Sequence, residues 1–286
     1  SCFFPKSSGL KAYWRLLFQG SDAISEVPAT HWSKQDYFDP DPRTPDRVYC
    51  TRGGFLSPVD FDPSEFGIPP SSLEATDTSQ LLALAAAKQA LRDAGLPIEP
   101  RRASVILGVT GTQELVIPLS SRLGFPKWRR ALQDAGIDAE RSERIIRNIA
   151  DSYVSWQESS FPGLLGNVVA GRISNRLDLS GTNCVVDAAC ASSFAALHLA
   201  LLELASGRSD LVITGGVDTL NDIFMHMCFS KTHALSPRGV CRALDESADG
   251  IVLGEGIVVV ILKRLADAER AGDRIYAVIK GMRTAS

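Results

Sequence analysis

Cys190 is the residue whose surroundings most clearly suggest chemistry. The stretch 183–202, Asn-Cys-Val-Val-Asp-Ala-Ala-Cys-Ala-Ser-Ser-Phe-Ala-Ala-Leu-His-Leu-Ala-Leu-Leu, predicts a short buried strand at Cys184 to Val186, a tight turn and a long helix. Cys190 lies where the turn becomes the helix. The first N–H groups of a helix have no internal partner and carry partial positive charge, so a thiol there is favoured as thiolate. The same groups can hold the oxyanion that forms when the sulfur attacks a carbonyl.

The helix after this turn is apolar almost all round. From Ala191 to Ala205 its one charged residue is Glu203, and His198 is its one other ionisable group. A helix of this composition is expected to be buried on all sides. The segment 211–216, Leu-Val-Ile-Thr-Gly-Gly, predicts another buried strand. Strand, turn, helix and strand together predict a βαβ unit that carries the thiol at its mouth.

Four blocks of sequence carry a resemblance to a known family. The block Val186-Asp-Ala-Ala-Cys-Ala-Ser-Ser193 resembles the active-site signature of β-ketoacyl synthases, the condensing enzymes of fatty acid and polyketide synthesis. The blocks before and after it agree in order and spacing: Gly166–Gly181, Ala234–Asp245 and Ala248–Gly256. Other segments are most similar to ketosynthases of polyunsaturated fatty acid synthases, namely Arg52–Phe55, Glu74–Leu82, Phe161–Gly166 and Phe229–Thr232.

The resemblance implies an architecture. The family has the thiolase-like fold, an α/β fold in which two similar halves pack as five layers. Residues 1–286 are identified as the N-terminal half of a ketosynthase domain, with the C-terminal half truncated and an insertion at about 111–160 around the substrate entrance. The chain is expected to start after the family's first strand. The family also pairs its subunits edge to edge through the strand that leads to the nucleophile, here Asn183 to Val186, which implies a homodimer.

The resemblance also implies a reaction, the decarboxylative Claisen condensation. Cys190 matches the nucleophile, which accepts an acyl group from the phosphopantetheine arm of an acyl carrier protein. Its backbone N–H matches one oxyanion donor. Malonyl-carrier then loses CO₂, and its carbanion attacks the acyl thioester. No directly bound cofactor or metal is expected. The implied partners are the acyl carrier protein domain, a second copy and the other domains of the same synthase.

The family's two activating histidines belong to its second half, one of them in a His-Gly-Thr-Gly-Thr motif that does not occur in this sequence. The isolated chain is therefore expected to be inactive in condensation and to expose apolar surface. One alternative is a non-catalytic, truncated ketosynthase-like dimerisation module. Another is a thiolase-like acyltransferase, which the block Ala248–Gly256 disfavours. Cysteine rather than glutamine at position 190 argues against a chain-length-factor relative.

Composition excludes several classes of protein. The 286 residues carry a net charge of −3, so nothing electrostatic favours nucleic acid as a partner. No apolar run approaches the ~18 residues of a membrane span. The six cysteines have no zinc-like spacing and indicate free thiols in a reducing compartment, which predicts a cytoplasmic protein.

The remaining polar candidates have structural interpretations. Asp187 is expected to accept backbone N–H groups in the turn, and Ser192 and Ser193 to bond locally. Glu255 is expected to make a buried hydrogen bond. Gly215-Gly216 and Gly254-Glu-Gly256 match no phosphate-binding loop and are interpreted as sites of close backbone packing.

Of the histidines, His198 is excluded as the base for the thiol, while His233 could approach the site. His198 follows Cys190 by eight residues on one helix, which places it about 12 Å further along the axis. His31 lies in a loop, and the resemblance assigns His233 no role.

The rest of the chain alternates strands with helices, which favours an α/β fold. Residues 27–63 predict a long surface loop held to the body by its aromatic side chains. Asp77 is a predicted N-cap for a helix. The predicted helices are 10–17, 78–94, 128–134, 140–152 and 222–230. The predicted strands are 104–110, 250–264 (or two strands joined at a glycine bulge) and 275–280.

Overall fold

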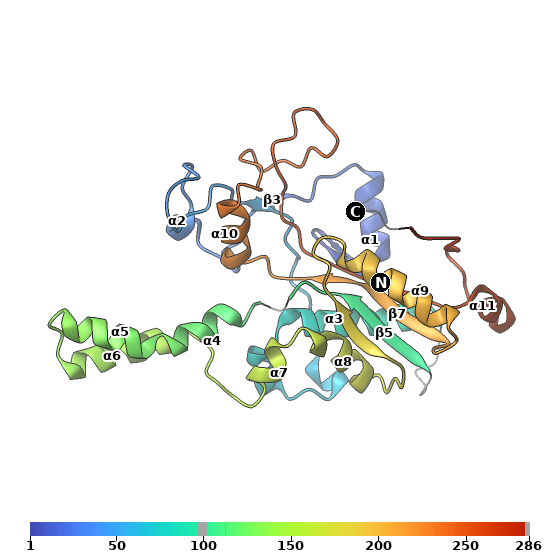
Figure 1. Ribbon diagram of the computed structural model, residues 1–286, viewed down its shortest axis with the longest axis horizontal. Coiled ribbons are helices and arrows are strands. Elements are labelled where there is room, and N and C mark those ends of the chain that lie inside the picture. Colours follow the sequence, from blue (N-terminus) through green and yellow to red (C-terminus); the bar gives the residue numbers. More distant parts are fainter. Residues whose placement is uncertain (96–101, 112, 284–286) are drawn as a thin grey trace.

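The computed structural model describes residues 1–95, 102–111 and 113–283. Within them, a mixed six-stranded sheet has helices on both faces (Figure 1). Its order is β2-β1-β8-β7-β5-β6, with β1 (Cys2–Phe4), β2 (Ser7–Ser8), β5 (Ala103–Gly108), β6 (Asn183–Val186), β7 (Leu211–Asp218) and β8 (Gly256–Leu262). The predicted α/β class is confirmed, and this chain supplies three layers, helix, sheet and helix.

The sheet brings the ends of three strands to one edge. β5 runs parallel to β6 and β7, with Gly108 opposite Val186 and Gly216. β8 is antiparallel to β7 and pairs its first residue, Gly256, with Asp218. Carboxyl ends of parallel strands meet at one edge of a sheet, where α/β proteins place their functional residues. We call this the carboxyl edge.

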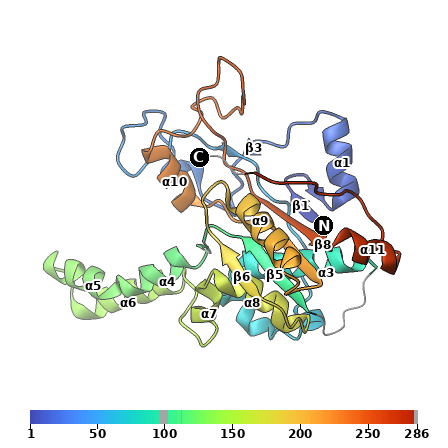
Figure 2. The same cartoon turned by 45° about the vertical axis from the view of Figure 1, so that its right-hand side comes forward.

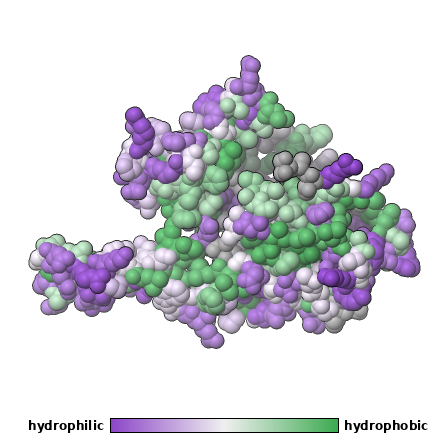
Figure 3. Space-filling view, in the orientation of Figure 1, coloured by the Kyte–Doolittle hydropathy of each residue, from purple (hydrophilic) through white to green (hydrophobic). Residues whose placement is uncertain are grey.

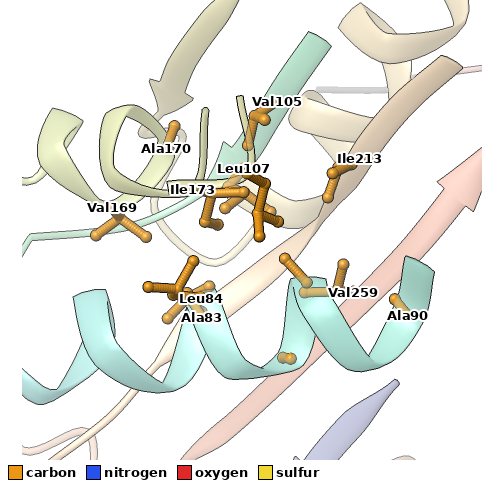
Figure 4. Packing of buried hydrophobic residues seen from close by; sticks show 14 of the residues in the cluster. Ala83, Leu84, Ala90, Val105, Leu107, Val169, Ala170, Ile173, Ile213 and Val259 are labelled. Carbon is orange, nitrogen blue, oxygen red and sulfur yellow. The ribbon is translucent and has the colours of Figure 1, made fainter. Parts of the chain in front are cut away.

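One face of the sheet carries the main hydrophobic core. Helices α3 (Thr78–Asp93) and α8 (Asn167–Arg176) pack here against β5, β7 and β8. Leu84, Leu107 and Ile213 are fully buried among them (Figure 4). Alanines on α3 let the helix lie close to the sheet. The predicted N-cap is confirmed, since the Asp77 side chain accepts a hydrogen bond from the N–H of Ser79.

The opposite face is covered by α9 (Ser192–Ala205), the helix that follows Cys190. It buries Ala196, Ala200 and Leu204, which recur every four residues along one side. Its other side is open to solvent, with Phe194 65% and Leu202 52% exposed, and apolar surface gathers there in Figure 3. The expectation that this chain exposes apolar surface is confirmed, because within it the sheet covers only one side of a helix whose composition suits burial on all sides.

A helical arm leaves the body after β5. It consists of α4 (Val116–Leu123), α5 (Phe125–Asp134) and α6 (Ala139–Ala150), and it projects away from the sheet in both views (Figures 1 and 2). The helices predicted at 128–134 and 140–152 are confirmed as α5 and α6. Arg129 and Glu143 form an ion pair that joins them.

Short elements surround this framework. Trp32, Tyr49 and Phe55 of the long loop are buried, as predicted, while Tyr37 is exposed. The other helices are α1 (Leu10–Phe18), α2 (Lys34–Tyr37), η1 (Pro63–Phe66), η2 (Pro70–Ala75), α7 (Ser160–Leu164), α10 (Ile223–Lys231) and α11 (Leu265–Ala271), and the second sheet pairs β3 (Ser25–Glu26) with β4 (Arg52–Gly53). In the described ranges, no helix combines the length and the apolar composition that crossing a membrane requires.

Several strand predictions need correction. β6 is a half-buried edge strand rather than a buried one, because only β5 pairs with it. Cys2–Phe4 forms β1 and pairs with β8, although no strand was predicted in this segment. Residues 250–264 contain only β8, because Ile251 and Gly254 make isolated bridges to separate loops. Residues 275–280 form no strand, having no neighbouring strand to pair with in the described part of the chain.

Candidate active site

Cys190 lies on an exposed turn at the carboxyl edge, between β6 and α9. Helix α9 begins two residues later at Ser192, so the predicted strand–turn–helix order around the cysteine is confirmed. The residue before the cysteine, Ala189, has a φ of +50°. Only glycine adopts this left-handed conformation without steric cost, so the surroundings must hold the turn in place.

Local hydrogen bonds hold this turn. Asp187 Oδ1 accepts the N–H of Ala189 at 3.0 Å, the structural role predicted for it. Ser192 Oγ accepts the N–H of Ala188 at 2.9 Å and donates to the carbonyl of Ala189 at 2.6 Å. Ser193 makes no such bond within the described residues, so the prediction of local bonding is confirmed for Ser192 only.

The N-terminus of α9 is open. It has no side-chain cap, and the N–H groups of Ser193 and Phe194 have no acceptor within the described residues. Unpaired N–H groups and the helix dipole make such an end favourable for negative charge. The arrangement can therefore stabilise a thiolate or an oxyanion next to Cys190.

Two glycines bring α9 close to the sheet. A Cβ on Gly108 would come within 2.5 Å of the Ser192 carbonyl carbon and the Ser193 nitrogen. A Cβ on Gly216 would come within 2.9 Å of the Ser193 Cβ. Gly215, with a φ of +148°, lies against the Val258 carbonyl. The prediction of close backbone packing at Gly215-Gly216 is confirmed. In the second block, a Cβ on Gly256 would come within 2.7 Å of the Phe4 ring, whereas nothing lies within 4 Å of a Cβ on Gly254.

A buried polar cluster lies at the start of β8. Glu255 Oε1 accepts the N–H of Asn221 at 2.7 Å, and Oε2 accepts the N–H of Leu56 at 2.7 Å. His31 Nε2 contacts the same carboxylate at 2.8 Å. The predicted buried hydrogen bond of Glu255 is confirmed. The contact also gives His31 a structural role, because it ties the long loop to the sheet.

The four histidines do not form a base for Cys190. His31 pairs with Glu255, His233 stacks on Tyr49, and His198 is exposed on α9. His226, which no sequence pattern singled out, is fully buried on α10, with Nδ1 3.1 Å from the Asp222 carbonyl. Within the described residues, none of the four contacts the thiol.

The other thiols differ from Cys190 in their surroundings. Burial raises the pKa of the Cys2, Cys50 and Cys184 thiols, which keeps them protonated and unreactive. Cys228 and Cys241 are exposed, like Cys190, but neither precedes an open helix N-terminus that follows a strand. None of the six is in a disulfide, as predicted.

Thr110 is the polar residue at this site that sequence reasoning missed. Its Oγ1 lies 3.1 Å from Ser192 Oγ and 3.4 Å from the Ala189 carbonyl. The predicted strand 104–110 contained the signal, because a polar side chain at its carboxyl end must reach the edge where the nucleophile turn lies. Within the described residues, no group of three or more His, Cys, Asp and Glu side chains could hold a metal ion.

Comparisons with known proteins agree on one family. The family profile described as Beta-ketoacyl synthase, N-terminal domain matches residues 1–268. The chain is 39% identical over its full length to part of a polyunsaturated fatty acid synthase of Thraustochytrium sp.. It is 37% identical over its full length to part of a phenolphthiocerol/phthiocerol polyketide synthase of Mycobacterium tuberculosis.

Solved structures give the same result. An oxazolomycin ketosynthase domain from Streptomyces albus superposes with a TM-score of 0.79 at 29% identity over 96% of this chain. The ketosynthase from module 6 of the bacillaene synthase of Bacillus subtilis gives 0.77 at 28% identity, again over 96%. These neighbours establish the thiolase-like fold. The chain spans 43% and 41% of these two structures, and 10% and 14% of the two synthase polypeptides.

Proposed function

The chain belongs to the β-ketoacyl synthase family, and from this premise we propose that it supplies the nucleophile of a ketosynthase in a multidomain fatty acid or polyketide synthase. The observation that carries the proposal is the placement of Cys190. Its exposed thiol lies at the carboxyl edge, just before the N-cap of α9, and the N–H groups of Ser193 and Phe194 in that helix have no acceptor within the described residues. We propose that residues 1–286 act as the N-terminal part of the domain, with 111–160 as an insertion.

The first step is acyl transfer. The Cys190 sulfur attacks the carbonyl carbon of an acyl thioester carried on the phosphopantetheine of an acyl carrier protein. The tetrahedral oxyanion is held by the Cys190 N–H and the open end of α9. The bond to the pantetheine sulfur then breaks, that sulfur takes up a proton, and the acyl group remains on Cys190.

The second step forms the carbon–carbon bond. Malonyl-carrier loses CO₂, and the electron pair of the broken bond becomes a carbanion. The carbanion attacks the acyl carbonyl on Cys190, and the cysteine leaves as thiolate. The carrier keeps a β-ketoacyl thioester. Decarboxylation needs groups that stabilise the developing enolate, and the family resemblance implies two histidines for this purpose.

The positions of the histidines favour a second candidate function for the isolated chain. Because none of the four contacts Cys190 within the described residues, the isolated chain could serve as a non-catalytic dimerisation module. In the synthase, the same residues act together with a second half, a partner copy, the carrier domain and the neighbouring domains.

Product analysis by mass spectrometry tests the proposal. A synthase containing this chain should form β-ketoacyl-carrier from acyl-carrier and malonyl-carrier, and Cys190→Ala should abolish it. Cys228→Ala, which removes another exposed thiol, is the matched control and should leave the product unchanged. Residues 1–286 alone should give no β-ketoacyl product. Product above the Cys190→Ala background from this chain would mean that one of its own residues supplies the base.

A further inference from the structure

We propose that Ser192 and Thr110 are positioning residues that together hold the turn presenting the Cys190 thiol. The inference rests on the proposed role of Cys190 as nucleophile. The turn needs such support because Ala189 adopts a left-handed φ of +50° that alanine disfavours.

The Ser192 hydroxyl both donates and accepts within the turn. Its single proton goes to the Ala189 carbonyl at 2.6 Å, and one lone pair accepts the Ala188 N–H at 2.9 Å. Thr110 Oγ1 lies 3.1 Å from Ser192 Oγ and 3.4 Å from the Ala189 carbonyl, so its one proton can be donated to either oxygen. Because the Ser192 proton is bound to the Ala189 carbonyl, none is left for substrate, so Ser192 acts on the turn rather than in the chemistry.

Thr110 joins the turn to the sheet. It follows β5 by two residues, and the N–H of the intervening Val109 donates to the Val186 carbonyl at 3.1 Å. The backbone next to Thr110 is thereby fixed to β6, the strand that leads into the turn. Gly108, which leaves room for Ser192 close to β5, brings the two hydroxyls within reach. The turn is therefore held at its helix end by Ser192 and at its strand end by the bond between Val109 and Val186. Thr110, which follows β5, contacts it from the side.

Loss of the contact between Ser192 and Thr110 should lower the reaction rate of the Cys190 thiol. If the pair is removed, Ala189 can relax towards a more favourable φ, and Cys190 then moves relative to the open end of α9. The thiol should lose reactivity although it remains exposed. A purely structural serine would change stability without this selective effect.

The test measures alkylation rates of individual thiols in the 286-residue chain by iodoacetamide labelling and peptide mass spectrometry. Ser192→Ala and Thr110→Val should each slow alkylation of Cys190 by about tenfold, the scale that one lost hydrogen bond corresponds to. Cys228 and Cys241 are exposed thiols in the same molecules, and their rates should not change. Thr110→Ser keeps the hydroxyl and should restore the wild-type rate.

Ser193→Ala is the matched control, because it removes a neighbouring hydroxyl that has no hydrogen-bond partner within the described residues. It should alkylate like the wild type. Melting temperatures of all variants identify any loss of folding, which would raise labelling at buried Cys2 and Cys50. Cys190 rates within twofold of wild type in both Ser192→Ala and Thr110→Val would overturn the inference alone. A wild-type Cys190 that reacts no faster than Cys228 would overturn the proposed function as well.

Discussion

Asp77 shows how one buried carboxylate can join two parts of the molecule. Its Oδ1 accepts the N–H of Ser79 at 2.9 Å and caps α3, while Oδ2 accepts the N–H of Glu114 at 3.2 Å. Glu114 returns the contact by accepting the Thr78 N–H at 2.6 Å. Asp77 is 2% exposed, and burial raises the pKa of its carboxyl above the ordinary value of 3.8. The base of the arm is thus joined to α3 by two carboxylates that are costly to ionise.

The sign of the pH dependence follows from this shift. A raised pKa in the folded protein means that folding favours the protonated form, so the contribution of Asp77 to stability is present below pH 3.8 and is lost as pH rises through the raised pKa. Asp77→Asn retains an N-cap oxygen and cannot titrate. Denaturant midpoints measured across this pH range should vary less in Asp77→Asn than in the wild type. Parallel curves for the two proteins would show that Asp77 does not titrate in this way.

Residues whose partners are close in sequence were the ones that sequence reasoning could interpret. The bonds of Asp187 and Ser192 lie within four residues, and the capping role of Asp77 within two. The His31–Glu255 contact spans 224 positions, and neither residue type indicates the other. The role of Thr110 could not be predicted for the same reason, because its partner Ser192 is 82 positions away in the sequence. Such pairs become evident only after the strand order is known.

At the scale of elements, the separation of β5 and α9 determines where the nucleophile turn lies. Gly108→Ala would place a methyl group within 2.5 Å of the Ser192 backbone, and both elements are held by their other contacts. We expect Gly108→Ala to destabilise the protein by about 1–3 kcal/mol, the usual cost of overpacking, and to slow acylation of Cys190. Chemical denaturation and acylation rates measure the two effects.

Gly166→Ala provides the control for this substitution. Gly166 has an ordinary helical φ of −59°, and nothing lies within 4 Å of a Cβ built on it. The Gly166→Ala variant should unfold at the same denaturant concentration as the wild type. If Gly108→Ala did the same, the close approach of α9 to β5 would not be a real constraint.

Elements with strong local signals were predicted well. The Asp77 N-cap marked the start of α3 (Thr78–Asp93), and α5 and α6 lie close to the ranges predicted for them. The apolar composition of α9 indicated a helix that needs cover on several sides, and the side that the sheet does not cover is exposed in this chain. The strand predictions for 250–264 and 275–280 were wrong, the first in its length and the second altogether. A strand also needs a neighbouring strand to pair with, which the local sequence does not reveal.

At the scale of the whole molecule, β6 forms one of the two outer edges of the six-stranded sheet. β6 pairs with β5 on one side, and no strand covers its other side within the described residues. Exposed strand edges are sites of strand-to-strand association. We expect a ketosynthase containing this chain to sediment as a homodimer, and Cys190→Ala to do the same, since assembly does not need the thiol. A monomer at micromolar concentration in analytical ultracentrifugation would contradict this expectation.

The proposed acceptor of the acyl group is Cys190, and acyl transfer to it can be followed without condensation. The 286-residue chain is incubated with an acyl-phosphopantetheine thioester and digested, and the peptides are analysed by mass spectrometry. The acyl mass should be found on the peptide that contains Cys190, and Cys190→Ala should remove it from the protein. Acyl groups on Cys228 or Cys241 instead, or acylation that persists in Cys190→Ala, would contradict this role of Cys190.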